Sequence, residues 1–278
     1  MTTAAALLGP DGPLARTLAG YEDRGGQLAM ADAVERALDA RRVLICEAGT
    51  GTGKTLAYLV PALLSGLKVV VSTATKALEE QIVHKDVPLI AEHLGLAPDV
   101  ALAKGLSNYL CLRRYHELRA DAGSHEDPTI RRSLPVLEAW AGDTETGDRG
   151  ELAALRDDDP IWREVVSSSE TRIGAACEHH GECFVTRMKK DAERARVVVV
   201  NHHLFFADLA VKQAAARRGF GGAGALPPYD AVIFDEAHEL EDVATSFFGV
   251  RLSRARVDAM LRDAERAFLA HGLSDRLL

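Results

Sequence analysis

Apolar and polar residues alternate along the first hundred residues in a way that predicts helices and strands in turn. Residues 28–40 (LAMADAVERALDA) repeat apolar positions at helical spacing, and the short apolar run VLICEA follows at 43–48. A glycine-rich loop comes directly after that run, and the apolar, helix-compatible LAYLVPALLSG comes after the loop. We therefore expect a helix, a strand, a glycine loop and a second helix, in this order.

The same alternation predicts the rest of a sheet. KVVVSTAT at 68–75 has the β-branched pattern of a strand, and KALEEQIVHKDVPLIAEHLG at 76–95 is helical. Later, the basic helical pattern FVTRMKKDAERAR at 184–196 precedes the strand patterns VVVV at 197–200 and AVIF at 231–234. Strands that alternate with helices predict an α/β fold, with a mostly parallel sheet and helices on both of its faces.

A long central region interrupts this rhythm. Residues 119–172 carry acidic and Gly- or Pro-containing stretches such as DAGSHEDP, AGDTETGDRGE and RDDDP, with amphipathic pieces between them. This composition predicts an insertion rather than another layer of the sheet. We expect four parts: the first part of the α/β domain at 1–104, an inserted domain at 105–183, the second part of the α/β domain at 184–245, and the start of a helical segment at 246–278.

Composition and charge narrow the class of protein only slightly. Of the 278 residues, 47% are hydrophobic and 27% are charged, as in an ordinary soluble domain. The apolar runs are too short to span a bilayer, and the N-terminus lacks the basic flank of a signal peptide, so we expect a cytoplasmic protein without membrane contact. The net charge of −8 argues against a simple DNA-coating protein but allows a local basic groove.

Residues 48–55 fit the phosphate-binding loop pattern, with an alanine where that pattern has its first glycine. They are Ala48, Gly49, Thr50, Gly51, Thr52, Gly53, Lys54 and Thr55. Glycines let backbone N–H groups curl around phosphates, and the following helix points its positive end at them. We expect Lys54 to reach the β- and γ-phosphates of ATP and the Thr55 hydroxyl to bind Mg²⁺. The alternative, a glycine turn that binds nothing, is disfavoured by the strand and helix predicted on either side.

The sequence Asp-Glu-Ala-His at 235–238 follows the predicted strand AVIF directly. A carboxylate at the C-terminal edge of a parallel sheet lies where such sheets bind ligands, and therefore faces the phosphate loop. We expect Asp235 to hold Mg²⁺ and Glu236 to orient or deprotonate the water that attacks the phosphate. The alternative is an acidic helix N-terminus that the helix dipole stabilises.

These motifs together resemble the superfamily 2 helicases. GKT at 53–55 and DEAH at 235–238 carry the resemblance, with VVVSTATKALEEQ between them. More narrowly, GLSNYLC at 105–111, then Cys177 and Cys183, then VVVVNHHLFFADL at 197–209 are similar to the DinG/XPD branch. The resemblance runs from about Tyr21 to about Val250.

The resemblance implies a RecA-like P-loop domain with a mainly helical, iron–sulfur-domain-like insertion. It also implies DNA-dependent ATP hydrolysis and 5′-to-3′ translocation along single-stranded DNA, in DNA repair or replication. Lys54, Asp235 and Glu236 would be the catalytic residues, and His238 would join the phosphate loop in binding the nucleotide. Gln27 stands where such helicases have an adenine-recognising glutamine; without the resemblance it would be an ordinary solvated helix residue.

The resemblance also places three polar residues near the DNA backbone and the ATP site: Thr73, Thr75 and Gln81. Two further features could contact DNA. The basic residues of the predicted helix at 184–196 could line a groove for the strand, although the acidic residues between them are equally typical of a solvated helix. Those basic residues are Arg187, Lys189, Lys190, Arg194 and Arg196. Tyr109 could stack on a base, although a lone tyrosine is more often a packing residue.

The four cysteines are too few for a disulfide scaffold and are expected to be free thiols or metal ligands. Relatives that bind an iron–sulfur cluster have four cysteines in the insertion, and Cys111, Cys177 and Cys183 match three of them. The second cysteine of that pattern falls five positions before the third, where this sequence has Arg172. An arginine donates hydrogen bonds only and cannot act as a ligand in place of a thiolate.

Three interpretations of this departure are open. The insertion can be free of a cluster and held by packing. It can bind a [4Fe–4S] cluster with a substitute ligand such as His179 or His180, because imidazole replaces thiolate on iron in some clusters. The cysteines can also be simple core residues. The remaining cysteine, Cys46, is expected in the core because it lies in the strand predicted before the phosphate loop.

The sequence shows the phosphate-binding half of such a motor, without a second apolar βα series before Leu278. We therefore expect a fragment that hydrolyses ATP slowly and does not separate strands on its own. The main rival is another P-loop enzyme, such as a small-molecule kinase or a nucleotidase. A third possibility is a non-catalytic module that binds nucleotide or DNA.

Overall fold

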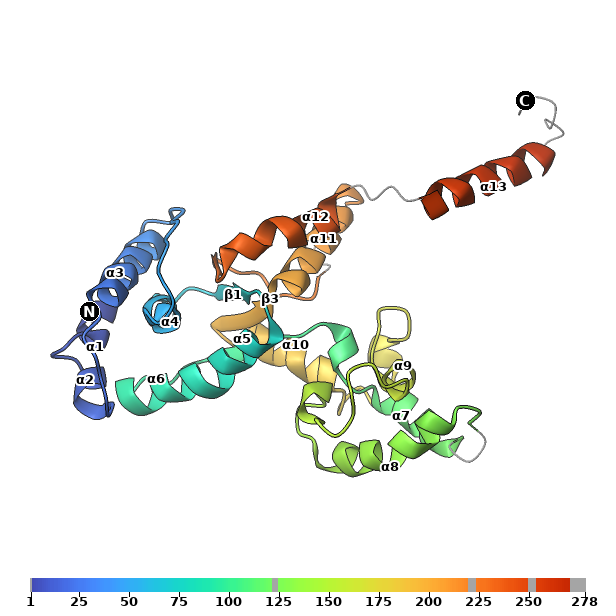
Figure 1. Ribbon diagram of the computed structural model, residues 1–278, viewed down its shortest axis with the longest axis horizontal. Coiled ribbons are helices and arrows are strands. Elements are labelled where there is room, and N and C mark those ends of the chain that lie inside the picture. Colours follow the sequence, from blue (N-terminus) through green and yellow to red (C-terminus); the bar gives the residue numbers. More distant parts are fainter. Residues whose placement is uncertain (1, 122–124, 220–223, 250–253, 271–278) are drawn as a thin grey trace.

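A four-stranded, all-parallel sheet lies at the centre of the computed structural model, which describes residues 2–121, 125–219, 224–249 and 254–270 (Figure 1). The strands are β1 (Val69–Thr73), β2 (Val100–Leu102), β3 (Val197–Asn201) and β4 (Ala231–Phe234). Their order across the sheet is β2-β3-β1-β4, and each neighbouring pair is parallel. The predicted α/β class with a mostly parallel sheet is confirmed.

Helices account for most of the remaining described chain. The helices before the insertion are α1 (Ala4–Leu8), α2 (Pro13–Thr17), α3 (Gly25–Asp39), α4 (Lys54–Leu64), α5 (Lys76–Gln81) and α6 (Val87–Leu94), with a π-helical turn at Ile82–Asp86. Those of the insertion are α7 (Leu112–Ala120), α8 (Pro128–Asp143) and α9 (Ile161–Val165). Those that follow are α10 (Phe184–Arg194), α11 (His202–Arg217), α12 (Leu240–Phe248) and α13 (Arg254–Ala270). None of the described helices is long and apolar enough to cross a membrane.

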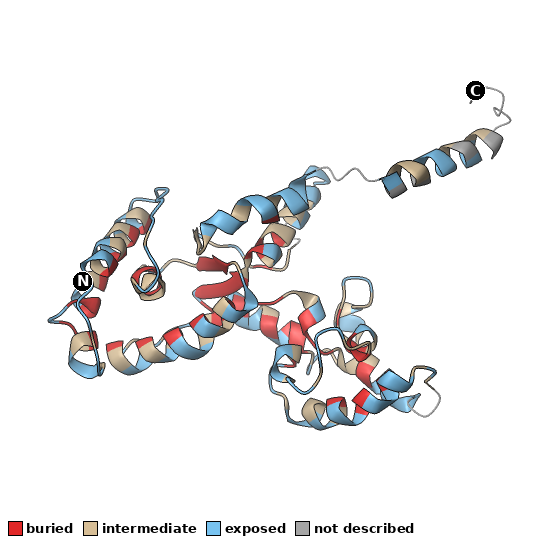
Figure 2. Ribbon diagram, viewed as in Figure 1, coloured by how far each residue is buried: buried red, intermediate tan, exposed pale blue. Residues whose placement is uncertain are grey.

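The valines of β1 and β3 build the core on both faces of the sheet (Figure 2). Side chains alternate between the faces of a strand, and strands that are covered on both faces read as continuous apolar runs. Val70, Val198 and Val200 pack in one hydrophobic cluster with α10, α11 and the helices of the insertion. Val69 and Val71 pack in a second cluster with α1, α3, α4 and α6.

The inserted region therefore shares its hydrophobic cluster with one face of the sheet. Leu137 of α8, Ile161 of α9 and Val198 of β3 belong to the same buried cluster. The insertion is mainly helical, as expected. The domain boundaries at 104, 183 and 245 stay predictions, and residues 271–278 of the predicted C-terminal helical segment lie outside the described residues.

Three of the four strands agree with the pattern of the sequence, and one prediction was wrong. The expected strand at 43–48 is irregular, with Val43 and Ile45 exposed at 93% and 94%. Cys46 is exposed as well, so the expectation of a core cysteine was also wrong. The backbone enters the left-handed region at Arg41 (φ 51°) after α3 ends, and the chain then runs outside the sheet. An apolar run forms a strand only where a neighbouring strand pairs with it, and periodicity alone does not show that neighbour.

Candidate active site

The phosphate loop makes the transition into α4 through glycines in the left-handed region. Gly51 has φ 78° and Gly53, the residue before α4, has φ 80°, a conformation that side chains with a Cβ rarely adopt. A Cβ added at Gly53 would lie 2.1 Å from Gln27 Nε2. No side chain caps the start of α4, so its first N–H groups remain available to an anion.

Side chains from α3 and its N-terminal flank hold this loop. Gln27 Nε2 donates to the Gly53 carbonyl at 3.0 Å, and Arg24 Nη1 donates to the Gly51 carbonyl at 2.8 Å. Within the loop, the Thr52 hydroxyl donates to the Gly49 carbonyl. Gln27 is only 5% exposed, so it is not the solvated residue that its bare position indicated. Its expected contact with adenine stays a prediction.

The two halves of the candidate nucleotide site meet at the C-terminal edge of the sheet. Lys54 Nζ lies 3.1 Å from Glu236 Oε1, although the two residues are 182 positions apart in the sequence. Asp235 continues from β4, where its N–H donates to the Ser72 carbonyl at 2.8 Å. Glu236 has φ 54°, a left-handed conformation that non-glycine residues adopt at a cost and that gathers at functional sites. This strained turn directs the glutamate toward the lysine.

Asp235 is hydrogen-bonded to Tyr58, a residue that sequence reasoning missed. Tyr58 OH donates to Asp235 Oδ2 at 3.2 Å from the second turn of α4. Burial and the neighbouring Glu236 carboxylate raise the pKa of Asp235 above its ordinary value. Burial and Asp235 also raise the pKa of the Tyr58 phenol, which therefore stays a donor at neutral pH. Its position four residues after Lys54, on the same face of the helix, is the signal that could have identified it.

His202 is a second missed residue, and it lies behind the acidic pair. Its ring is fully buried after β3, and Nδ1 lies 2.7 Å from the Ser72 hydroxyl. Burial lowers the pKa of His202, although Asp235 opposes the shift, so the ring is neutral. Its Nε2 is buried and has no partner among the described residues. The His202 ring therefore bonds to the end of β1 and lies beside the end of β4, where its centroid is 6.0 Å from that of the Phe234 ring.

The remaining predicted residues lie around this edge with different exposures. His238 is largely exposed, and its Nδ1 is 3.5 Å from Glu236 Oε2. Thr73 is fully buried, and the Thr75 hydroxyl caps α5 by accepting from the Leu78 N–H at 3.3 Å. Gln81 is exposed.

The side chains at this edge fit a magnesium-bound triphosphate. Lys54 supplies an ammonium, Asp235 and Glu236 supply two carboxylates, and Thr55 supplies a hydroxyl at the uncapped start of α4. No group of three or more His, Cys, Asp or Glu could hold a metal by itself in the part of the chain that the structure describes. Mg²⁺ is commonly bound through one or two carboxylates together with substrate phosphates, so a protein cage is not required.

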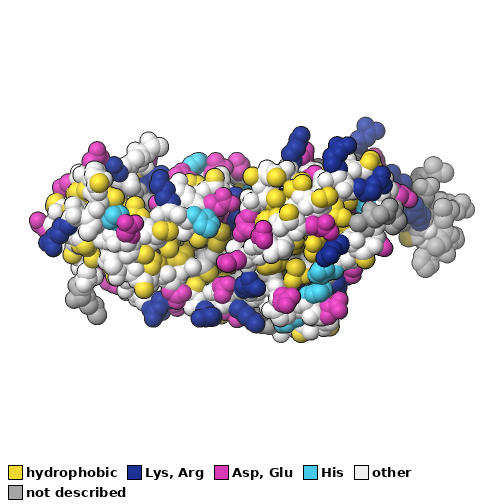
Figure 3. All heavy atoms as spheres, turned by 90° about the horizontal axis from the view of Figure 1, so that it is seen from below, with side chains coloured by type: hydrophobic (Ala, Val, Ile, Leu, Met, Phe, Trp, Pro, Cys, Tyr) yellow, Lys and Arg dark blue, Asp and Glu magenta, His cyan; other side chains and the backbone are white. Residues whose placement is uncertain are grey.

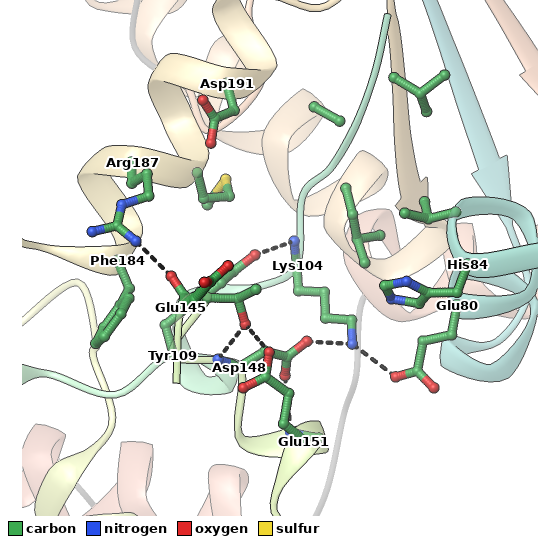
Figure 4. Close-up of a pocket in the computed structure, with 17 residues that line it drawn as sticks. Glu80, His84, Lys104, Tyr109, Glu145, Asp148, Glu151, Phe184, Arg187 and Asp191 are labelled. Atoms are coloured by element: carbon green, nitrogen blue, oxygen red, sulfur yellow. Dashed lines mark hydrogen bonds and ion pairs between the residues drawn. The ribbon is translucent and has the colours of Figure 1, made fainter. Parts of the chain in front are cut away.

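A cavity of about 520 Å³ lies away from the phosphate loop, between α10 and the insertion (Figure 4). Lys104 is 3% exposed there, and its Nζ lies 2.9 Å from Glu80 Oε1 and 2.5 Å from Asp148 Oδ2. Glu79 is fully buried nearby, and neither of its carboxylate oxygens has a partner among the described residues. Burial raises the pKa of Glu79 to about 7, although Lys104 opposes the shift.

The expected DNA contacts receive mixed support. Tyr109 is 4% exposed and its hydroxyl accepts from the Lys104 N–H at 3.2 Å, which agrees with the packing alternative rather than with stacking on a base. On α10, Arg187 donates to the Glu145 carbonyl at 2.5 Å, and Lys189 is half-buried. Lys190 and Arg194 are exposed. On the face that Figure 3 shows, Lys and Arg side chains are interspersed with Asp and Glu rather than gathered.

The three cysteines of the insertion are each partly exposed. None of the three is fully buried, although Cys183 packs against the hydrophobic cluster of the insertion, so their interpretation as simple core residues stays open. They are not joined to one another or to a histidine in a group that could hold a metal, as far as the described residues show. With three thiols and an arginine in place of four thiols, the donor set does not fit a [4Fe–4S] cluster.

Several known proteins are similar to this chain in sequence. Residues 29–108 match the DEAD/DEAH box helicase family. The ATP-dependent DNA helicase YoaA of Haemophilus influenzae is 41% identical over 91% of this chain and 38% of its own length. The YoaA of Escherichia coli is 41% identical over 93% of this chain and 40% of its own length. The ATP-dependent helicase DinG of Mycobacterium tuberculosis is 37% identical over 87% of this chain and 38% of its own length.

These matches confirm the resemblance drawn from the sequence motifs. The chain spans about two fifths of the length of the curated relatives it matches.

Proposed function

Because this chain carries a DEAD/DEAH box helicase domain and is homologous to the DinG and YoaA helicases, we propose that it is the ATP-binding and ATP-hydrolysing motor domain of a DNA helicase. The observation that carries the proposal is the 3.1 Å contact between Lys54 Nζ and Glu236 Oε1. It brings the phosphate loop and the acidic motif into one site, which a phosphoryl-transfer reaction needs.

The contact also assigns a task to each partner. A triphosphate at the loop competes with Glu236 for the Lys54 ammonium, because three phosphates carry more negative charge than one carboxylate. When Lys54 turns to the phosphates, Glu236 loses its ion-pair partner and is left to orient or deprotonate a water. Glu236 is about one-third exposed, which leaves its carboxylate accessible to that water.

Thr55 and Asp235 would hold Mg²⁺ in this proposal. The ion, when bound, neutralises charge on the β- and γ-phosphates. Asp235 must be ionised to bind it, and its raised pKa therefore makes magnesium binding weaker toward acidic pH. Tyr58 opposes that effect, because its hydrogen bond stabilises the ionised carboxylate.

Single-stranded DNA is the proposed track, with 5′-to-3′ movement in repair or replication. The support is the resemblance to the DinG/XPD branch and the similarity to the two YoaA proteins, which are named as ATP-dependent DNA helicases. A DNA substrate is also the reason to propose a cytoplasmic location. Lys190 and Arg194 on α10 are the exposed cations that this proposal assigns to the DNA backbone.

The test is the rate of ATP hydrolysis with and without single-stranded DNA, in wild type and in Glu236→Gln. We expect DNA to accelerate turnover in the wild type, and the variant to bind ATP but to lose turnover. Phosphate transfer to a small acceptor would instead identify a kinase. Binding without turnover in the wild type would identify a non-catalytic module. Either result contradicts the proposal.

A further inference from the structure

Two guanidinium groups lie among the three thiols of the insertion. Arg113 follows Cys111 by two residues, and its Nη1 donates to Glu117 Oε1 at 2.5 Å. Its Nη2 donates to the Thr171 carbonyl at 3.0 Å, next to Arg172. Arg113 therefore joins α7 to the loop that carries the other cysteine positions.

Arg172 makes a similar connection close to the third thiol, that of Cys183. Its Nη2 donates to the Thr186 hydroxyl at 2.9 Å, and its Nε is buried without a partner among the described residues. Cys183 precedes α10 directly, and Thr186 lies in the first turn of that helix. The guanidinium is thus bonded to the first turn of the helix that Cys183 precedes.

His179, one of the two candidate substitute ligands, makes contacts with protein groups. The His179 ring stacks on His116 at a centroid distance of 4.9 Å and an interplanar angle of 27°. Its Nε2 lies 3.6 Å from Glu178 Oε1. The stacking on His116 and the hydrogen bonds of the two arginines join the loop to α7 and α10.

We infer that the insertion of this chain folds without an iron–sulfur cluster, and that Arg172 is the residue that excludes one. A guanidinium has five donors, no acceptor and a permanent positive charge, so it repels iron at the position where the fourth ligand must stand. Its hydrogen bond to Thr186 joins this loop to α10, a connection that a cluster would otherwise have to make. The inference goes beyond the proposed function, because none of these residues belongs to the nucleotide site.

The experiment is a gain of cofactor in the variant Arg172→Cys. Wild type, Arg172→Cys and Arg172→Ser are purified without oxygen and incubated with ferrous iron and sulfide, and bound iron, bound sulfide and visible absorbance are measured. We expect substoichiometric iron in the wild type and roughly four iron and four sulfide ions per chain in Arg172→Cys. Arg172→Ser is the matched control, because it removes the arginine without adding a thiolate, and it should stay free of iron.

Each arm has a result that overturns the inference. Stoichiometric iron and sulfide in the wild type would show that three cysteines suffice, and this arm does not depend on any variant. Stoichiometric iron in Arg172→Ser would show the same. An Arg172→Cys protein that keeps wild-type circular dichroism and nucleotide binding, yet takes up no iron, would show that Arg172 is not what excludes the cluster.

Discussion

The candidate nucleotide site and the cysteine-bearing insertion both match family motifs, but their motif residues differ in how completely they are present and in how they contact one another. At the nucleotide site, Lys54 and Glu236 come from distant segments and meet at 3.1 Å. In the insertion, three cysteines keep their places in the pattern, while Arg172 fills the fourth and bonds to Thr186. A motif therefore transfers a function only where the residues that carry the chemistry are present, because one replaced ligand changes the chemistry of the whole group.

The two regions also hold their charges in different surroundings. Lys54 and Glu236 are each about one-third exposed, so a ligand can reach and rearrange them. Lys104, between α5 and the insertion, is 3% exposed and paired with Glu80 and Asp148 (Figure 4). Buried charges are costly to separate, whereas half-exposed ones exchange partners readily. This difference suits the first region to binding and the second to joining parts of the fold.

The largest expected effect is at the nucleotide site, with Lys54→Ala. Removing the ammonium leaves the triphosphate without its main cation, so affinity for an ATP analogue should fall on the order of 1000-fold. Titration with a fluorescent, non-hydrolysable analogue measures it. Lys85→Ala, which changes an exposed lysine of the π-helical turn, is the control and should bind as the wild type does. Equal affinity in Lys54→Ala and the control would show that Lys54 does not bind the triphosphate, and would contradict the difference drawn between the two regions.

The free energy of unfolding should depend on pH through the buried carboxyl group of Glu79. The variant Glu79→Gln tests this dependence. The pKa of Glu79 is about 7 in the folded chain against an ordinary 4.5, so the folded state holds a proton that the unfolded state releases. The stability that this proton contributes is present below about pH 4.5 and is lost as pH rises through about 7. Relative to Glu79→Gln, the wild-type free energy of unfolding should fall by up to about 3 kcal/mol across that range. Denaturant titrations at several pH values measure the difference, and parallel curves for the two proteins would contradict it.

In the insertion, Arg172→Ala should destabilise the fold by roughly 1–3 kcal/mol. The change removes the hydrogen bond to Thr186 and leaves a void beside a buried position. Arg156→Ala is the control, because Arg156 is a largely exposed partner of Asp158, and such surface pairs contribute little. Urea unfolding measures both variants. An Arg172→Ala protein as stable as the control would contradict the claim that Arg172 stabilises the insertion.

The smallest expected effect concerns Tyr58→Phe, which keeps the ring and removes one hydrogen bond. Asp235 loses the donor that favours its ionised form, so magnesium-dependent nucleotide binding should weaken by about 1 kcal/mol, and more at acidic pH. Nucleotide titrations with Mg²⁺ at two pH values measure this change. A loss that is the same at both pH values would show that Tyr58 acts on packing rather than on the Asp235 carboxylate.

Sequence reasoning located what is encoded locally. The valine runs of β1 and β3, the glycine loop and the acidic motif all carry their signal within a few residues, and the structure agrees with each. It missed Tyr58 and His202, because both lie in apolar surroundings where they read as packing residues. It was wrong about Cys46, because burial depends on partners that are distant in sequence. The short strand β2 was also missed, since three residues are too few to show a period.

The central claim is that Lys54 and the carboxylates after β4 form a single site for magnesium-bound ATP. The direct measurement is the affinity for a non-hydrolysable ATP analogue with and without Mg²⁺, in wild type and in Asp235→Asn. We predict that Mg²⁺ tightens binding to the wild type, and that Asp235→Asn loses most of this gain while it keeps its magnesium-free affinity. A variant in which Mg²⁺ tightens binding as strongly as in the wild type would contradict the claim.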